Sequence, residues 1–442
     1  RIASNGNIIV GGQSANGTIT STDVLALSYS PTGVQQWATI YSDSTTTFDE
    51  QFYSMALDPS GNVYIAGTDF LHQLVYRIDA NGSMAWRKSW SSPVNNFNTI
   101  PFDIATDEVG GIYTVGKGIY PGPNHFGNGG LDNLNVVKYS AAGDSLWTYR
   151  LTSNTDVSIG FSIDVHDGKV YAGGFKADTA YVDENFFTSI LDTSGTIVNE
   201  WEFSGIGNTI MRGQFVRTDA TNNVYCAGTI DRLYSNGLDV AIVKYDPDGN
   251  LLWEKYYTTP GWRNDTLTGM DLDQNGNIIL SISSDTNATG TGYQPTLVKM
   301  SVAGNFLDTI WYNNVSTGVQ FANSMLVRTD GSVVLCGTAS ISGGYLAYFD
   351  DQLNHQWTAL IDSTPSAITK VNSVSSFPNG DIAVVGYSQT GPGTTGKLVA
   401  KQNLTEGKLT LDVSSYTTGL YMYSVIGNAN QTLKTGKITV SH

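Results

Sequence analysis

The sequence has few of the features on which nucleic-acid-binding and membrane proteins depend. Only 14% of its 442 residues are charged, acidic residues outnumber basic ones, and the formal net charge is −16. Binding of nucleic-acid phosphates or of an anionic membrane surface needs clustered lysine and arginine, and the chain contains no basic run. We therefore predict that nucleic acid is not a partner.

Cysteine, histidine and long apolar segments are scarce as well. The two cysteines, Cys226 and Cys336, lie in apolar segments of repeats that are not neighbours, so we expect free buried thiols. None of the five histidines has a metal-ligand spacing such as H-E-x-x-H. No apolar run reaches the roughly 18 residues of a membrane helix, so no transmembrane segment is predicted.

One short phrase occurs eight times along the chain. Its clearest copies are DPSGNVYIAGT at 58–68, DATNNVYCAGT at 219–229 and RTDGSVVLCGT at 328–338. The turn positions of the eight copies are Gly6, Gly61, Gly110, Gly168, Asn222, Gly276, Gly331 and Gly380. Repeats of about 49–58 residues that carry strands and no helical pattern are typical of radial β-arrays. The sequence predicts an all-β propeller of four-stranded antiparallel blades over 1–401, with eight blades preferred and seven as the alternative.

The fifth repeat shows how one blade is built. It divides into four strands, which we call a, b, c and d, at 212–220, 223–229, 240–246 and 250–257. The a–b and c–d links are tight turns, in which glycine or asparagine can adopt the positive φ that a short hairpin requires.

A tryptophan recurs at a fixed distance after the c–d turn in five repeats. These residues are Trp37, Trp86, Trp147, Trp253 and Trp357. The constant spacing predicts a structural role, in which each indole packs between neighbouring blades. Trp201 follows its turn two residues later and can keep the same strand face, whereas Trp311 has an odd offset and is predicted to face the other way.

Function is expected on the long links between the strands. All short a–b and c–d turns fall on one face of such a disc, and all long links share the other face. Binding residues are usually carried by loops on a rigid scaffold. The aromatic residues that we select on this face are Tyr120, Tyr234, Trp262 and Tyr293.

Polar residues also precede or begin the a strands. They are Asp49, Glu50, Asp103, Asp156, Asn264 and Asp265. If the a strand is innermost, these side chains surround one mouth of a central channel, where carboxylates could bind a cation or act as an acid and base pair. Solvated loop ends are the preferred interpretation of these residues, and the channel-mouth site is the alternative.

No cofactor is predicted, and Ca²⁺ is the one alternative considered. The segment 271–276 fits the first half of a calcium loop through Asp271, Asp273 and Asn275. Ile282 stands where such a loop needs its final acid, and the same residues serve an ordinary a–b turn.

The repeats resemble the bacterial seven-bladed β-propeller (SBBP) repeat family. The matching phrases are DPSGNVYIAGT at 58–68 and VKYDPDGNLLWEKYY at 243–257. The resemblance implies blade geometry and does not name a ligand. The c–d phrase is also similar to the tryptophan-docking motif of pyrroloquinoline-quinone dehydrogenases, but the chain lacks the adjacent cysteine pair of those enzymes.

The segment 402–442 departs from the repeats and resembles the end of a type IX secretion C-terminal sorting domain. The matching residues are Leu411 to Ser414, Gly419, Tyr421, Lys434, Gly436 and Lys437. The resemblance implies recognition by the type IX machinery and an extracellular or outer-surface location. The Y-P-N-P phrase that opens such domains is absent, so hairpins that close the propeller ring are the alternative.

Three functional hypotheses remain from the sequence. The first is a secreted or cell-surface propeller that acts as a non-enzymatic binding or scaffold module for a glycan or a protein. The second is an extracellular polysaccharide hydrolase or lyase that uses the carboxylates at the channel mouth. The third is a filament or envelope subunit, which would self-associate.

Overall fold

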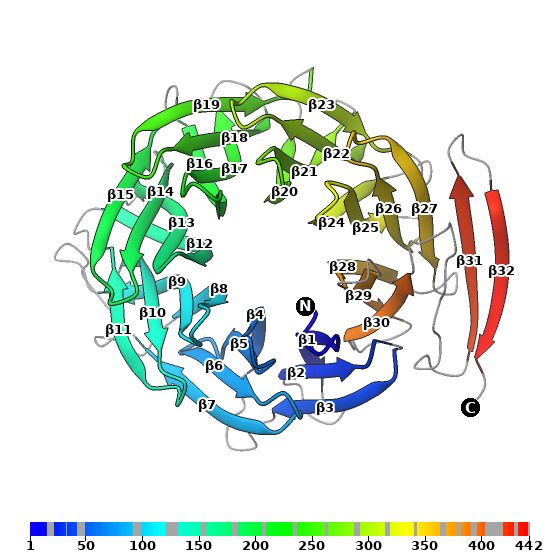
Figure 1. The fold of residues 1–442 in the computed structure, drawn as a ribbon, viewed down its shortest axis with the longest axis horizontal. Coiled ribbons are helices and arrows are strands. Elements are labelled where there is room, and N and C mark those ends of the chain that lie inside the picture. Colours follow the sequence, from blue (N-terminus) through cyan, green and yellow to red (C-terminus); the bar gives the residue numbers. More distant parts are fainter. Residues whose placement is uncertain are drawn as a thin grey trace.

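The fold was obtained as a computed structural model, shown in Figure 1. It describes residues 1–15, 22–31, 33–41, 49–91, 99–120, 131–151, 156–178, 184–205, 209–232, 237–260, 264–286, 292–313, 319–339, 343–362, 368–377, 382–389, 396–402, 419–427 and 432–440. In these residues no helix is long and apolar enough to cross a membrane.

The strands of the described residues form eight antiparallel sheets. The first three sheets contain β1 (Ile8–Ala15), β2 (Thr22–Tyr29), β3 (Gln35–Tyr41), β4 (Gln51–Leu57), β5 (Val63–Thr68), β6 (Gln73–Ile78), β7 (Met84–Trp90), β8 (Ile100–Thr106), β9 (Ile112–Tyr120), β10 (Leu131–Tyr139) and β11 (Ser145–Arg150). The next three contain β12 (Asp156–His166), β13 (Lys169–Asp178), β14 (Glu184–Asp192), β15 (Ile197–Phe203), β16 (Thr209–Thr218), β17 (Val224–Arg232), β18 (Leu238–Tyr245), β19 (Leu251–Tyr257), β20 (Asp265–Leu272), β21 (Ile278–Asp285), β22 (Tyr293–Met300) and β23 (Phe306–Trp311). The last two contain β24 (Gln320–Val327), β25 (Val333–Ala339), β26 (Gly343–Phe349), β27 (His355–Asp362), β28 (Ile368–Ser376), β29 (Ile382–Gln389), β30 (Gly396–Gln402), β31 (Gly419–Gly427) and β32 (Thr432–Val440).

The sheets stand around a common axis, so the predicted all-β propeller with four-stranded antiparallel blades is confirmed (Figure 1). Successive inner strands contact each other around the ring, and β1 contacts β30 where the ring closes. Six sheets contain all four repeat strands, while β1–β3 and β28–β30 form three-stranded sheets. The alternatives of eight and seven blades therefore differ only in how these two smaller sheets are counted.

The C-terminal strands lie outside the ring. β31 pairs with β27, the outermost strand of its blade, and β32 pairs with β31 (Figure 1). These two strands extend one blade outwards, while the last sheet of the ring itself is β28–β30.

The repeated phrase encodes a clamp at the a–b turn. In the fifth repeat, Asp219 Oδ1 accepts hydrogen bonds from the N–H groups of Thr221 and Asn223. Its Oδ2 accepts hydrogen bonds from the Asn223 side chain and from the Tyr225 hydroxyl. Asp58 and Asp107 bind the equivalent groups of their own repeats. The aspartate thus satisfies the backbone of the turn and fixes the tyrosine that follows.

This clamp makes the stability of the fold depend on pH in the acidic range. Burial alone would raise the pKa of Asp219, but hydrogen bonds from Asn223 and Thr221 outweigh it and lower the pKa to about 2. A carboxyl with a depressed pKa in the folded state stabilises the fold fully above its unfolded pKa of about 3.9 and loses this contribution as the pH falls through about 2. We expect the urea midpoint of the wild type to fall more between about pH 5 and pH 2 than that of Asp219→Asn. Equal acid dependence of the two proteins, measured by fluorescence, would show that Asp219 does not contribute.

Tryptophans join neighbouring sheets. The indole N–H groups of Trp37, Trp86, Trp147 and Trp253 donate to backbone carbonyls in the c–d turn of the following sheet. The acceptors are Ala80, Ala141, Thr193 and Val302. The glycine in each of these turns has a positive φ, and a Cβ placed there would meet the docked indole. Each tryptophan therefore docks on a turn that only glycine fits closely.

Trp201 and Trp311 face the directions that their sequence offsets predict. A Cβ on Gly249 would lie 2.0 Å from Trp201 Nε1, so Trp201 faces the following sheet despite its longer spacing. Trp311 is 53% exposed and donates to the Tyr257 hydroxyl of the preceding sheet, which is the opposite direction. Trp357 stacks on Tyr348 with ring centroids 5.5 Å apart.

The apolar core is divided among the spaces between sheets. One cluster, for example, joins Tyr171 and Phe186 of one sheet to Val216 and Cys226 of the next. Both cysteines are free and buried, as predicted. The ring is therefore held together by many similar interfaces between neighbours.

Candidate binding site on the inner rim

The innermost strands share an irregularity that the sequence analysis did not identify. In seven of them the pairing register with the next strand shifts by one residue at the equivalent position. The residues left between the paired positions are Tyr53, Phe102, Phe161, Gln214, Thr268, Asn323 and Asn372. Such bulges re-aim side chains and are frequent beside functional sites. We call these seven residues the rim residues.

Three consecutive rim residues form an aromatic row. The ring of Tyr53 lies edge-on to Phe102 with centroids 5.5 Å apart, and Phe102 lies 5.1 Å from Phe161. Phe175 extends the row, 5.9 Å from Phe161. The three rim rings are only partly buried. Because β4, β8 and β12 are neighbouring inner strands (Figure 1), the row runs along the inner edge of three blades.

The other four rim residues carry amides and a hydroxyl. Gln214 accepts a hydrogen bond from the Thr229 hydroxyl, and Thr268 donates to the Ser281 carbonyl. The Asn323 amide donates to the Thr338 hydroxyl and to the Val371 carbonyl of the next sheet, while Asn372 is exposed. Their strands, β16, β20, β24 and β28, follow β12 around the inside of the ring (Figure 1). The rim thus has an aromatic half and a polar half.

Asp103 holds together the strands that carry the aromatic row. It follows Phe102 directly, and its Oδ1 accepts hydrogen bonds from the Ser54 hydroxyl and the Ile104 N–H. Its Oδ2 accepts one from the Ile163 N–H, so one carboxylate links β4, β8 and β12. Burial raises the pKa of Asp103, although these hydrogen bonds act in the opposite direction. The carboxylate therefore fixes the spacing of the three strands that carry the rings.

Glu50 belongs to the interface between the first two sheets. Its side chain is 2% exposed, and its Oε1 lies 3.3 Å from Arg87 Nη2. Arg87 also lies over the ring of Tyr41 in the preceding sheet, 5.2 Å from its centroid. Burial raises the pKa of Glu50, while Tyr76 and Arg87 act in the opposite direction. The preceding Asp49 accepts a hydrogen bond from the Thr22 N–H.

The other predicted mouth residues are also engaged locally. Asp156 lies 3.5 Å from Lys176 Nζ, and the Asn264 side chain accepts a hydrogen bond from the Leu238 N–H. Asp265 is fully buried and accepts two hydrogen bonds from Thr259, and burial raises its pKa. Within the described part of the chain, no three Asp, Glu, His or Cys residues are grouped as metal ligands. The polar residues at the start of the a strands therefore make separate local contacts.

The calcium candidate is built as an a–b clamp. Asp273 Oδ1 accepts hydrogen bonds from the N–H groups of Asn275 and Asn277. Its Oδ2 binds the Asn277 amide and lies 3.1 Å from Lys299 Nζ. Asp271 lies 3.8 Å from Arg217 Nε, and burial raises its pKa. An ammonium group thus occupies the side of Asp273 where a cation would bind.

One of the four predicted aromatic binding residues can be placed with its side chain. Tyr293 is partly buried at the start of β22, and its ring lies 5.1 Å from that of the exposed Phe321. Tyr234 and Trp262 lie outside the described residues, as does the side chain of Tyr120. Tyr293 and Phe321 therefore form a second, smaller aromatic surface.

A positional signal for the rim residues exists in the sequence. The rim residue stands five positions before the first residue of the a–b turn, as in Tyr53 and Asp58, Phe102 and Asp107, or Gln214 and Asp219. The spacing identifies the equivalent rim position in each repeat. It does not show that this residue is bulged or that the rim residues of neighbouring sheets are in contact.

No protein-family profile and no curated protein matches the sequence. Among solved structures, the fold is similar to a PL25 ulvan lyase, at 12% identity over 79% of this chain and 93% of that one, with a TM-score of 0.50. It is also similar to puromycin hydrolase, at 10% identity over 84% of this chain and 58% of that one (TM-score 0.47). A third is prolyl oligopeptidase B from Galerina marginata, at 10% identity over 88% and 56% (TM-score 0.44). The likeness to the ulvan lyase shows the fold alone. This chain spans less than two thirds of the last two proteins.

Proposed function

We propose that the protein is a secreted or cell-surface binding module that holds a glycan chain at its inner rim. The observation that carries this proposal is the row of Tyr53, Phe102 and Phe161 on three neighbouring inner strands, whose equivalents on four other inner strands carry amides and a hydroxyl. Aromatic rings offer apolar surfaces to sugar rings, and a few placed polar groups orient a ligand through its hydroxyls. The net charge of −16 favours an uncharged glycan over a polyanionic one.

The cellular location is part of the same proposal. It is supported by the resemblance of residues 402–442 to a type IX sorting domain and of the repeats to the SBBP family. Export through the type IX machinery would place the rim where environmental or surface glycans occur. Fusion of residues 402–442 to a reporter, expressed in a bacterium that has this machinery, tests the location: a reporter retained inside the cells would contradict it.

Phe102→Ala is expected to weaken glycan binding about tenfold. Loss of one aromatic contact is worth about 1.4 kcal/mol, which corresponds to that factor. The measurement is calorimetric titration with uncharged oligosaccharides, selected first on a polysaccharide panel. Phe321→Ala is the matched control, because it removes a partly exposed ring from another surface. A loss of affinity in Phe321→Ala but not in Phe102→Ala would move the site to the long links, and no binding across the panel would reject glycan recognition.

An extracellular polysaccharide hydrolase or lyase is the second candidate. Asp103 favours it, since this carboxyl lies directly beside the aromatic row and has a raised pKa. Its hydrogen bonds, however, go to Ser54, Ile104 and Ile163 and join three neighbouring strands. Release of new reducing ends from a polysaccharide by the wild type, abolished in Asp103→Asn, would establish an enzyme and overturn the binding-module proposal.

A further inference from the structure

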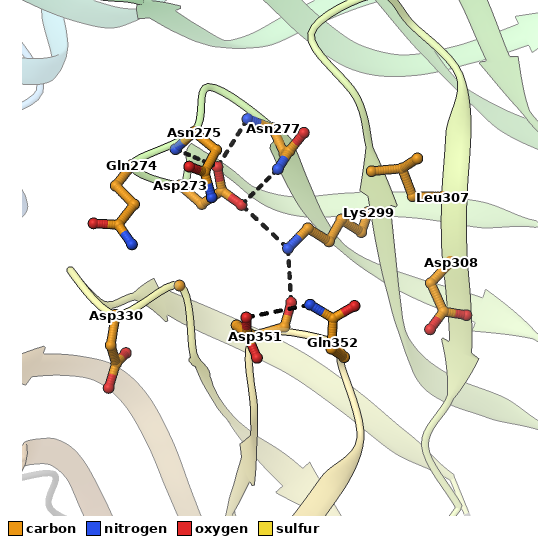
Figure 2. A pocket seen from close by; sticks show the side chains of 11 residues that line it. Asp273, Gln274, Asn275, Asn277, Lys299, Leu307, Asp308, Asp330, Asp351 and Gln352 are labelled. Atoms are coloured by element: carbon orange, nitrogen blue, oxygen red, sulfur yellow. Dashed lines mark hydrogen bonds and ion pairs between the residues drawn. The ribbon is translucent and has the colours of Figure 1, made fainter.

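The outer strands of the ring differ in charge. Strands β7, β11, β15, β19 and β23 each have a charged residue within the five positions that begin at the place of Trp253 in the strand register. These residues are Arg87 and Lys88, Arg150, Glu200 and Glu202, Glu254 and Lys255, and Asp308. Figure 2 shows Asp308 beside Leu307 on β23. Strands β3 and β27 have no charged residue in the same window, which reads WATIY at 37–41 and WTALI at 357–361.

Charged residues on an outer strand oppose the addition of a further strand. An edge strand presents a row of unpaired N–H and C=O groups, and proteins prevent unwanted pairing there with charged side chains, lysine above all. A charge that is covered by a second backbone loses hydration, which is unfavourable unless the charge finds a partner. Five outer strands therefore have a protection that β3 and β27 lack.

One of the two uncharged strands, β27, is covered by another strand. β31 pairs with it in antiparallel register from Trp357 to Asp362, and β32 pairs with β31 (Figure 1). Thr358 is fully buried in this arrangement, and Leu360 is partly buried. An uncharged outer strand thus accepts a further strand in this fold.

The other uncharged strand, β3, has the same pattern and an open outer edge. The dipeptide Gln-Trp at 36–37 recurs at 356–357, and both strands have a register shift at the same place. Among the described strands, β3 pairs with β2 alone. Ala38 is exposed and Ile40 is 54% exposed, whereas their counterparts on β27 are covered. β3 is therefore the uncharged outer strand that remains available for pairing.

We propose that the outer edge of β3 pairs in antiparallel register with β3 of a second copy of this chain. The pairing joins the β1-β2-β3 sheets of the two copies into one sheet of six strands, the size that the sheet from β24 to β32 already has. A strand that pairs antiparallel with itself fits the two-fold symmetry of most homodimers. Since β3 lies at the outer margin of the ring (Figure 1), this contact is separate from the inner rim and does not depend on the glycan proposal.

Charge selects a second β3 as the partner. The net charge of −16 makes two copies repel each other, so a contact between them is best made where neither copy is charged. Pairing of the window 37–41 with itself brings no like charges opposite each other. β32, which ends the sheet of β27, contains Lys434 and Lys437, the residue type that opposes strand addition. β31 already has a partner on each side. A second β3 pairs without breaking any existing contact.

Ile40→Lys tests the pairing, because it gives β3 the protection that the other outer strands have. The measurement is light scattering at protein concentrations from about 10 µM to about 1 mM, since one pair of strands is a small interface and a weak dimer is expected. We expect the mass of the wild type to rise from monomer to dimer over this range. Ile40→Lys should weaken the dimer at least about tenfold.

Leu252→Lys is the matched control. Leu252 is 50% exposed on β19, an outer strand that already carries Glu254 and Lys255. This variant should dimerise like the wild type, and circular dichroism shows whether both variants keep the fold. Amide hydrogen exchange, followed by mass spectrometry, locates the contact. The amides of 35–41 should exchange more slowly at the high protein concentration than at the low one, while those of 251–257 should not change.

Three results would overturn the proposal. The first is a wild type that stays monomeric over the whole range, and the second is an Ile40→Lys variant that dimerises like the wild type. The third is concentration-dependent protection that appears in other strands and not in β3. Growth of the mass beyond the dimer would also contradict it, because pairing of β3 with β32 of another copy gives open chains, whereas pairing of β3 with β3 closes after two copies.

Discussion

Trp201→Ala is expected to lower the free energy of unfolding by about 3–5 kcal/mol, because it leaves a large cavity in the space between two sheets. Trp201 is 8% exposed and stacks on Tyr245 of the next sheet, with ring centroids 4.8 Å apart and planes at 25°. The same cluster contains Phe186 and Val216, which would lose contact with the indole. The measurement is urea unfolding followed by circular dichroism.

Trp311→Ala is the matched control for this prediction. Trp311 is 53% exposed, and its main polar contact is the hydrogen bond to Tyr257. We expect Trp311→Ala to lower the free energy of unfolding by about 1 kcal/mol, the typical value of one hydrogen bond. Similar losses in the two variants would mean that the docked position does not contribute more than an exposed one, and the docking interpretation would be wrong.

Gly249→Ala is expected to lower the free energy of unfolding by about 3 kcal/mol for two separate reasons. The backbone φ of Gly249 is +93°, where a Cβ is strained by about 1–2 kcal/mol. The new Cβ would also lie 2.0 Å from Trp201 Nε1, and overpacking of this kind costs about 1–3 kcal/mol. Thermal and urea unfolding of the variant measure the sum.

Gly110→Ala separates the two contributions. Gly110 has a φ of +86°, and a Cβ there would meet no atom within 4 Å. It should therefore show only the conformational part, about 1–2 kcal/mol. The double variant Trp201→Ala with Gly249→Ala should be less destabilised than the sum of the single variants, since the clash is absent once the indole is removed. Strict additivity would show that the indole and the turn do not interact.

Local patterns predicted much of the fold. The Gly-Asn turns at Gly61 and Gly276 have both the positive φ and the clamp geometry that their repeated phrase indicates. The odd offset of Trp311 predicted that it would face away from the docked tryptophans, because side chains alternate along a strand. These features depend on residues within one hairpin, where the sequence spacing fixes the geometry.

The candidate site on the inner rim could not be predicted from the sequence in the same way. Tyr53, Phe102 and Phe161 lie about fifty residues apart, and their contacts depend on how three sheets stand next to each other. The predicted mouth residues were selected on charge and position, yet Glu50 and Asp265 bind partners inside their own interfaces. A one-residue register shift also changes the direction of a side chain, and nothing in a single strand's sequence specifies it.

The sequence by itself determined the repeat, because the same phrase recurs every 49–58 residues. It also determined the strands, the short turns and the tryptophan positions, because each of these follows from spacing within about ten residues. Tertiary structure alone decided which side chains meet across the interfaces. Trp201 is visible in the sequence, but its packing depends on Tyr245 and Gly249 in the next blade. Such a contact is a property of two packed surfaces, so it exists only once the neighbouring sheet is in place.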